Sequence, residues 1–560
     1  MATDAAPRRS FALFVAAGIL LSRVAGLIRE RVFAHYFGTG AAAGAFKAAL
    51  RIPNFLQNMF GEGVLSASFI PVYARLVGAG DEKEAGRVAG AIATLLSIVV
   101  AVLVAVGVLF TPLLVAMIAP GFTGESRALT IRLVRILFPG IGLLVLSAWC
   151  LGILNSHRRF FISYVAPVLW NAAMIASMVI FGVSSSQTRL AEYLAWGTVV
   201  GCVLQLAIQI PFVLKLEREL RFGIGRTVEG VREVVRNFLP VFVGRGVVQV
   251  SAYVDELLGS LLGASVFASL GFAQTIYLLP VSLFGMSVAA AELAEMSREQ
   301  GARDEAYARL RARLQSGLRQ IAFLVIPTTI AFIVIGRFLV SGLYETGAFD
   351  LSAAYFVWYI LAAYAVGLIA STMGRLYSSA FYAMGDTKTP LRIAVARVIG
   401  GAIFAYLFAF PLRAPFVTLL RDVLDLPMPE FREEGIVVPA AVALGAVGLA
   451  FGSAIAAWIE FVLLRRNLTR RVGAVHVGAQ FFVLITLASL IAGGAAYLGA
   501  LICSPVATWS LPFGLARIAY AAVICIVFGT VYFLFTAAFK VPESRSVLRR
   551  ITRRNEATSR

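Results

Sequence analysis

The chain has 560 residues, of which 60% are hydrophobic and only 14% are charged. Its mean hydropathy is +0.86, and no soluble protein of this length can hide so much apolar surface. The formal net charge of +19 is spread over loops and a short tail, which argues against nucleic acid as a partner. The composition therefore predicts an integral membrane protein.

Apolar runs of about 20 residues recur along the whole chain, as helices that span a bilayer require. We predict an all-α fold of about fourteen transmembrane helices. The second run is the least regular, because Lys47, Arg51, Asn54 and Glu62 interrupt it. In chain order the predicted spans cover residues 11–37, 45–77, 88–118, 128–154, 161–183, 190–213, 233–263, 266–296, 316–341, 353–383, 391–411, 437–464, 478–502 and 514–539.

The loops between these spans alternate in basic content. One set of loops, which includes both termini, carries about thirty lysines and arginines, and the other set carries about five. Cytoplasmic loops are the ones enriched in basic residues. We therefore predict a multi-pass protein of the bacterial cytoplasmic membrane with both termini in the cytoplasm.

The first predicted span is apolar but carries Arg23, Arg29, Glu30 and Arg31. A charge near the centre of a membrane helix costs about 2.5–3.5 kcal/mol on insertion scales. We expect this helix to line a wet, charged cavity. The alternative is that Arg29 to Arg31 mark the end of a short span and only Arg23 is internal.

The second and seventh spans also carry internal polar residues. On the seventh, Arg245, Gln249 and Glu256 share one helical face, with Asp255 beside them. Intramembrane ion pairing would explain some of these charges, but not why three separate helices each carry arginine. On the second span one face holds Lys47, Arg51, Asn54, Asn58 and Glu62.

Catalytic and metal-binding motifs are not apparent in the sequence. It has no Gly-rich phosphate loop, no H-E-x-x-H and no nucleophile elbow. The four cysteines lie in apolar segments without metal or disulfide spacing. We predict that the protein is not an enzyme and needs no metal or cofactor.

Loop and helix features recur at an offset of about 230 residues. Ile52-Pro53 corresponds to Leu279-Pro280, and the basic turn at 155–159 corresponds to the one at 385–388. We predict two six-helix lobes in a pseudo-twofold arrangement with a polar cavity between them. The predicted divisions are an N-terminal lobe (1–225), a C-terminal lobe (226–470), two further helices (471–540) and a basic cytoplasmic tail (541–560).

Five segments resemble the MurJ/MviN lipid II flippases of the MOP exporter superfamily. They are SRVAGLIRERVFAHYFG at 22–38, RIPNFLQNMFGEGVLSASFIPVYA at 51–74, APGF at 119–122, LYETGAF at 343–349 and GDTKTP at 385–390. The resemblance implies alternating access that moves lipid II, a polyprenyl pyrophosphate carrying the disaccharide-pentapeptide of peptidoglycan, to the outer leaflet. It also implies cell-wall synthesis proteins as partners, and membrane lipids around a groove for the prenyl tail beside the last two helices.

The resemblance also implies a set of substrate-binding residues. Arg23 and Arg29 match arginines of the family's first helix, and Ser22 matches their neighbour. Arg51 stands where the family has a basic residue, and Glu62 matches the acid of an E-G pair. To these we add Asn54 from the polar stripe.

Three positions depart from the family pattern. Gly44 replaces an acidic residue, Gln57 replaces an arginine, and Thr275 stands where an arginine is expected on the eighth helix. We hypothesise that Arg245 takes the place of that last arginine, with Arg375 and Arg397 as further candidates.

Several alternatives remain open at this stage. The substrate could be another polyprenyl-pyrophosphate-linked oligosaccharide, or the chain could be a non-transporting scaffold of the cell-wall machinery. A cationic-drug exporter would favour acidic cavity residues, so the arginines argue against it. The membrane potential, a sodium ion and a proton are alternative driving forces, and the sequence does not define the oligomeric state.

Overall fold

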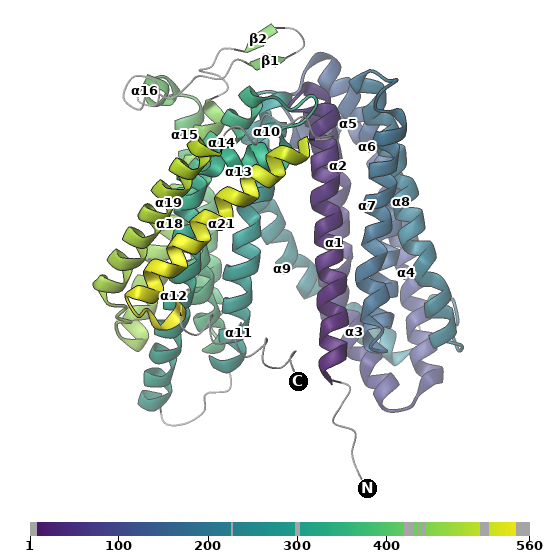
Figure 1. The fold of residues 1–560 in the computed structure, drawn as a ribbon. Coiled ribbons are helices and arrows are strands. Elements are labelled where there is room, and N and C mark those ends of the chain that lie inside the picture. The colour runs from purple at the N-terminus through teal and green to yellow at the C-terminus, as the bar shows by residue number, and fades with distance from the viewer. Residues whose placement is uncertain are drawn as a thin grey trace, which may run out of the picture. The chain divides into compact units, whose positions relative to one another are not determined.

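The computed structural model describes residues 8–225, 228–296, 303–418, 431–433, 436–438, 444–503 and 514–544. These residues are almost entirely helical, which confirms the predicted all-α membrane fold (Figure 1). Two short antiparallel strands, β1 (Phe431–Glu433) and β2 (Ile436–Val438), are the exception within the described part of the chain.

The chain forms two compact units, Met1–Ala268 and Ser269–Arg560, so that the boundary falls inside α10. The predicted division into lobes at residue 225, with a separate C-terminal pair of helices, stays a prediction. The first unit contains α1 (Arg8–Phe37), α2 (Ala41–Phe60), α3 (Glu62–Gly78), α4 (Glu82–Leu109), α5 (Thr111–Ile118), α6 (Gly124–Ser156), α7 (Phe160–Phe181), α8 (Gln187–Leu216), α9 (Glu229–Ser260) and the start of α10 (Ala264–Pro280).

The second unit continues from α10 through a short π-helix, η1, in which the helical turn is widened. Its elements are η1 (Val281–Met286), α11 (Ser287–Met296), α12 (Arg303–Val334), α13 (Gly336–Tyr344), α14 (Leu351–Ala383), α15 (Lys388–Ala409), α16 (Arg413–Thr418), the two strands, α18 (Gly445–Val472), α19 (Ala479–Ile502) and α21 (Leu515–Ala538).

Eleven helices of the described residues are long and apolar enough to cross a membrane. The predicted first, second and seventh spans, which correspond to α1, to α2 with α3, and to α9, are not among these eleven, and the side chains of α1 and α9 lie in part outside the described residues. The total of about fourteen spans therefore stays a prediction, while the multi-pass character is clear.

The second predicted span consists of two helices rather than one. Gly61 separates α2 from α3, and its N–H donates to the carbonyl of Gln57 over 2.7 Å. A Cβ at Gly61 would lie 2.3 Å from that carbonyl oxygen, so the break requires glycine. The polar stripe thus lies on α2, and Glu62 begins α3.

The first unit has a core in which α3, α4 and α6 meet. Phe69 and Tyr73 stack there, and Trp149 donates its indole N–H to the carbonyl of Ala89 over 3.2 Å. Figure 1 shows α1, α7 and α8 running alongside one another in this unit. Long, closely packed helices of this kind hold side chains of α1 and α2 at defined depths.

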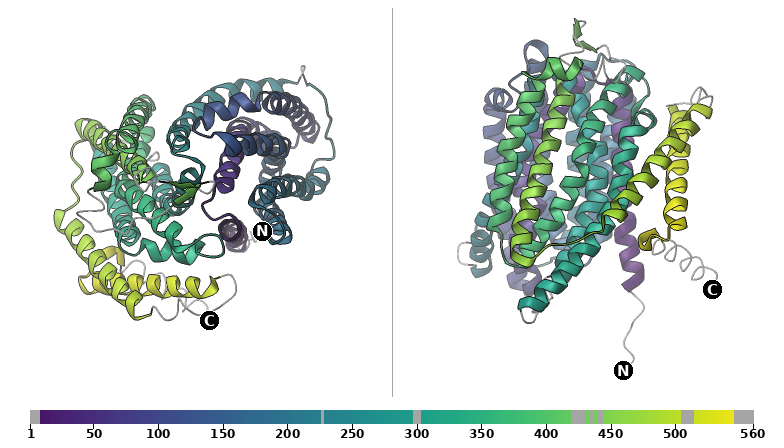
Figure 2. Two further views of the ribbon diagram at one scale, coloured as in Figure 1. Left: turned by 90° about the horizontal axis from the view of Figure 1, so that it is seen from above. Right: turned by 90° about the vertical axis from the view of Figure 1, so that its left-hand side faces the viewer.

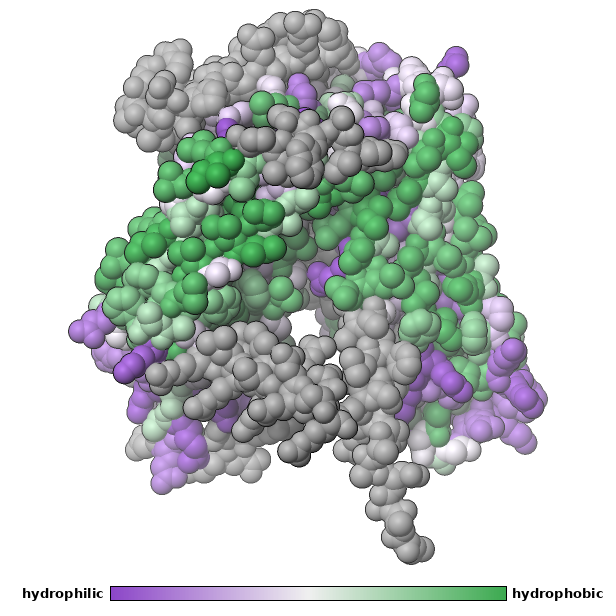
Figure 3. Space-filling view, viewed as in Figure 1, coloured by the Kyte–Doolittle hydropathy of each residue, from purple (hydrophilic) through white to green (hydrophobic). Residues whose placement is uncertain are grey.

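In the second unit α14 is the central helix and packs against α12 and α18. The last two described helices, α19 and α21, lie side by side at its edge (Figure 2). Their outer faces expose large apolar residues such as Leu498, Ile526 and Leu534. On the face shown in Figure 3, hydrophobic residues cover the flanks of the helices and hydrophilic residues gather towards their ends. This distribution suits contact with lipid chains.

Candidate functional site

A charged group joins α1 to α2 in the first unit. Arg29 Nη2 lies 2.7 Å from Glu30 Oε1, and Lys47 Nζ lies 3.5 Å from Glu30 Oε2. The three side chains are only 16–18% exposed. One carboxylate therefore serves two cations, and the group, which we call the α1–α2 charge cluster, keeps a formal charge of +1.

Aromatic rings cover both cations of this cluster. The Arg29 guanidinium lies 5.3 Å from the ring centre of Trp170, and the Lys47 ammonium lies 5.5 Å from that of Phe33. A ring face attracts a cation without neutralising it. The rings therefore fix both side chains in position while leaving their positive charge available.

The second predicted arginine helix, α2, is tied to α9. Arg51 Nη2 lies 3.0 Å from Glu256 Oε1, and the Tyr253 hydroxyl donates to the carbonyl of Arg51 over 3.0 Å. Glu256 is 8% exposed, whereas Arg51 is 44% exposed. One turn beyond Arg51, the buried Asn54 Oδ1 accepts no hydrogen bond among the described residues.

Arg23 contrasts with the paired arginines. It is exposed on α1, and the described residues offer it neither a hydrogen bond nor an ion pair. Ser22 beside it is half-buried. Ion pairing thus explains part of the charge on these helices, because Glu30 and Glu256 compensate two of the four cations Arg23, Arg29, Lys47 and Arg51. The six side chains together keep a formal charge of +2.

Two predicted site residues cannot be placed at the level of the side chain. Glu62 is the first residue of α3, and Arg245 lies in α9 between Pro240 and Glu256. Both side chains lie outside the described part of the structure. Their roles, including the substitution of Arg245 for the family arginine, stay predictions.

The structure gives physical reasons for two of the family departures. A Cβ at Gly44 would lie 2.0 Å from the backbone oxygen of Ala264, so α2 approaches the start of α10 too closely for an acidic side chain. Thr275 donates its hydroxyl to the carbonyl of Gly271, one turn earlier in its own helix. Neither position can supply the charged group of the family pattern.

Sequence reasoning missed Trp170 and Tyr253. Both are aromatic residues on long apolar helices, where a core position is the usual role. Only the fold brings them to Arg29 and Arg51. The pairing of Glu30 with Lys47 had a weak signal, since both are charged residues inside predicted spans.

The basic turn between α14 and α15 is held by Asp386. Its carboxylate accepts the backbone N–H of Lys388 over 3.0 Å and the Thr389 hydroxyl over 2.7 Å, and Arg471 Nη1 lies 2.6 Å away. The hydrogen bonds from Thr389, together with Arg471, lower the pKa of Asp386 to about 2. The end of α18 is therefore attached to this turn, within the GDTKTP motif.

The corresponding turn of the first unit has a different polar contact. The Tyr73 hydroxyl bridges His157 Nε2 at 2.9 Å and Glu217 Oε2 at 2.5 Å. Burial raises the pKa of Glu217, and the hydrogen bond from Tyr73 partly offsets this effect. In both units the turn after a long helix is thus attached to the end of a later helix, as the predicted repeat would require.

We expect Asp386→Asn to lower the melting temperature of the purified protein by about 1–2 °C at pH 7, because the turn loses a charged acceptor. The depressed pKa means that the carboxylate stabilises the fold above its ordinary value of 3.8 and loses this effect as the pH falls through about 2. The difference between wild type and variant should therefore shrink below pH 4 when melting is followed across pH. A difference that persists unchanged at pH 2 would contradict this explanation.

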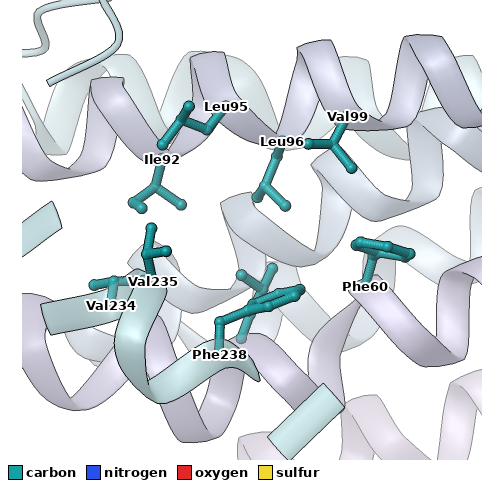
Figure 4. A pocket seen from close by; sticks show the side chains of 9 residues that line it. Phe60, Ile92, Leu95, Leu96, Val99, Val234, Val235 and Phe238 are labelled. Atoms are coloured by element: carbon teal, nitrogen blue, oxygen red, sulfur yellow. The ribbon is translucent and has the colours of Figure 1, made fainter. Parts of the chain in front are cut away.

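A hollow in the first unit lies between the end of α2 and the helices α3, α4 and α9 (Figure 4). It holds about 260 Å³, and Phe60, Leu96, Val234 and Phe238 are among its purely apolar lining residues. A space lined only by apolar side chains offers a charged headgroup no hydrogen bond. The charged residues of α1 and α2, and not this hollow, are the candidate binding residues.

Fold and site together define a multi-pass helical membrane protein of the transporter type, with cations held inside its helices. Residues 33–419 match the model of the family described as lipid II flippase MurJ. A probable lipid II flippase MurJ of Rhizobium tropici is 31% identical over 404 residues, which cover 70% of this chain and 74% of that protein. The chain belongs to the lipid II flippase MurJ family, as the sequence resemblance predicted.

Solved structures confirm the fold. A lipid II flippase MurJ in an inward closed conformation aligns with a TM-score of 0.71 at 22% identity, covering 94% of this chain and 98% of that one. An inward-facing multidrug resistance MATE family transporter of the MOP superfamily aligns with a TM-score of 0.59 at 18% identity, covering 82% and 98%. The family is one of transporters rather than enzymes. Among the described residues, no group of three or more histidines, cysteines, aspartates or glutamates could hold a metal ion.

Proposed function

We propose that this chain moves lipid II from the cytoplasmic to the outer leaflet of the bacterial inner membrane. In this proposal the cations of α1 and α2 bind the pyrophosphate of the substrate. The observation that carries the proposal is a surplus of two positive charges, and Arg23 has no partner among the described residues. The surplus is counted over four cations and two carboxylates, namely Arg23, Arg29, Lys47, Arg51, Glu30 and Glu256.

The chemistry of the substrate fits this surplus. An isolated charge in hydrocarbon costs tens of kcal/mol by Born solvation, which a free pyrophosphate would have to overcome. Arginine replaces lost hydration with short, charge-assisted and often bidentate hydrogen bonds. The unpartnered Asn54 Oδ1 would accept an O–H or N–H of the sugar or peptide.

Alternating access would move the headgroup alone. The two lobes would rock about the bound pyrophosphate, with both termini in the cytoplasm. The prenyl tail would stay in lipid beside α19 and α21, where Leu498, Ile526 and Leu534 are exposed. The coupling ion and the cell-wall partners are not part of this proposal.

A lipid II accessibility assay tests the function. Cells depleted of their own flippase would express this chain, and an added toxin that cleaves outward-facing lipid II would report translocation. We expect cleavage with wild type and loss of most cleavage with Arg23→Ala, because the free guanidinium is removed. Arg189→Ala, which removes an exposed arginine in the first turn of α8, is the matched control and should retain cleavage.

The departures at Gly44 and Thr275 favour one competing function, the translocation of another polyprenyl-pyrophosphate-linked oligosaccharide. The pyrophosphate is common to both substrates, and the missing charges would alter recognition of the saccharide or peptide. Correct membrane insertion without any cleavage of lipid II would favour this alternative. The same result would be expected of a non-transporting scaffold. A protein that binds no lipid-linked substrate at all would identify the scaffold.

A further inference from the structure

A second group of charged residues lies on α14, α15 and α18 of the second unit, three helices that Figure 1 labels. Arg397 Nη1 on α15 lies 2.9 Å from Glu460 Oε2 on α18. Arg375 on α14 is near enough to interact electrostatically with both, and also with Tyr277 of α10. We call Arg375, Arg397 and Glu460 the α14–α18 charge group.

The group lies well inside the apolar parts of its helices. Counted at 1.5 Å per residue, Arg375 lies about 12 Å from the end of α14 and Arg397 about 14 Å from the start of α15. Glu460 lies about 18 Å from the end of α18. The contact between Arg471 and Asp386 shows that all three helix ends meet on the same side, so the three charges lie at similar depths.

The charges of the group do not cancel. Glu460 is 14% exposed and is bound to Arg397, so one carboxylate compensates one of two arginines. Arg375 is an exposed side chain on a helix whose spanning window is 72% buried. Within the described part of the chain, no hydrogen bond and no ion pair involves its guanidinium.

Neutral hydrogen-bonding groups border Arg375. The Tyr277 hydroxyl lies 3.0 Å from Ser371 Oγ, one turn before Arg375 on α14. A lone cation at membrane depth is costly unless an anion compensates it. The surroundings are polar and positive, so the expected ligand is an anion and not a metal ion or a cationic drug.

We propose that Arg375, supported by Arg397 and Glu460, forms a second binding site for a phosphate-class anion. The ligand is the pyrophosphate of the lipid-linked substrate, so this inference rests on the proposed function. Arg375 would then supply, from α14, the positive charge that Thr275 does not supply from α10. Glu460 orients Arg397 beside the site. It also limits the net charge of the α14–α18 charge group to +1.

Binding of fluorescent lipid II to the purified chain in lipid nanodiscs tests the proposal. Arg375→Ala should weaken binding about 10-fold or more, as expected for the loss of a charged hydrogen-bond donor, and Arg375→Lys should lose less. Arg392→Ala is the matched control, because Arg392 is exposed in the second turn of α15 and should not affect binding. Glu460→Gln, which adds one net positive charge, should bind inorganic pyrophosphate more tightly than wild type.

The outcomes separate this inference from the proposed function. If wild type and Arg375→Ala bind lipid II equally, the second site is refuted and the function stands. If wild type binds pyrophosphate but not lipid II, and Arg375→Ala loses that binding, the site stands and the substrate is wrong. Displacement of the probe by phosphatidylglycerol vesicles but not by pyrophosphate would overturn the assignment to the substrate, since a phospholipid headgroup would then be the ligand. Equal losses with Arg375→Ala and Glu460→Gln would overturn the proposal, because Glu460→Gln removes no cation and both changes would then act only on the packing of the helices.

Discussion

Glu30→Gln should lower the free energy of unfolding by about 3 kcal/mol, because it leaves Arg29 and Lys47 in a nearly buried place without their shared carboxylate. Removal of one partner of a buried ion pair costs far more than the pair itself contributes. The expected result is a strongly lowered melting temperature of the detergent-purified protein, measured with its intrinsic tryptophan fluorescence.

The double variant Glu30→Gln with Lys47→Met is the control. It restores the formal charge of the α1–α2 charge cluster to +1 and replaces the ammonium with an apolar side chain that can still contact Phe33. We expect it to recover most of the lost stability. If Glu30→Gln melts like wild type, the carboxylate does not hold the cluster together, and the close distances to Arg29 and Lys47 have no energetic role.

The membrane fold could be predicted from the sequence because hydropathy is a local property. Eleven of the predicted spans coincide with helices that meet the length and apolarity of a membrane crossing. Lys47 and Arg51 make α2 less apolar than the other helices, and they are among the charged residues that pointed to function. The family resemblance was equally local, since its most specific segments lie in the first 74 residues.

The partners of the site residues could not be predicted, because they are distant in the sequence. Arg51 and Glu256 come from α2 and α9, and Trp170 reaches Arg29 from α7. Helical periodicity gives the face of a residue but not the neighbouring helix that it meets. The hypothesis that Arg245 replaces the family arginine likewise depends on which helices α9 meets, and helical periodicity does not give this.

The close approach at Gly44 is a further feature that no single sequence reveals. A glycine early in an apolar helix is usually interpreted as a small residue that permits close helix packing. The sequence does not indicate that the group packed against Gly44 is a backbone carbonyl. The structure places the Ala264 oxygen there and so explains why an acidic residue is missing.

Gly44→Asp should therefore not restore the family pattern but disrupt the packing of α2 on the start of α10. Its Cβ would lie 2.0 Å from the Ala264 oxygen, and backbone cannot move away as a flexible side chain can. Gly44→Ala already introduces that clash, so we expect both variants to lose about 1–3 kcal/mol of stability or more, as overpacked cores do.

Gly26→Ala on α1 is the matched control, because a Cβ there meets nothing within 4 Å. Alanine also favours a helix interior over glycine by about 1 kcal/mol, so this variant should melt at or above the wild-type temperature. Melting of the three purified variants checks the prediction. A Gly44→Asp protein as stable as Gly26→Ala would show that the backbone of α10 can move to accommodate a side chain at position 44. The close approach to Ala264 would then not be the reason for glycine at this position.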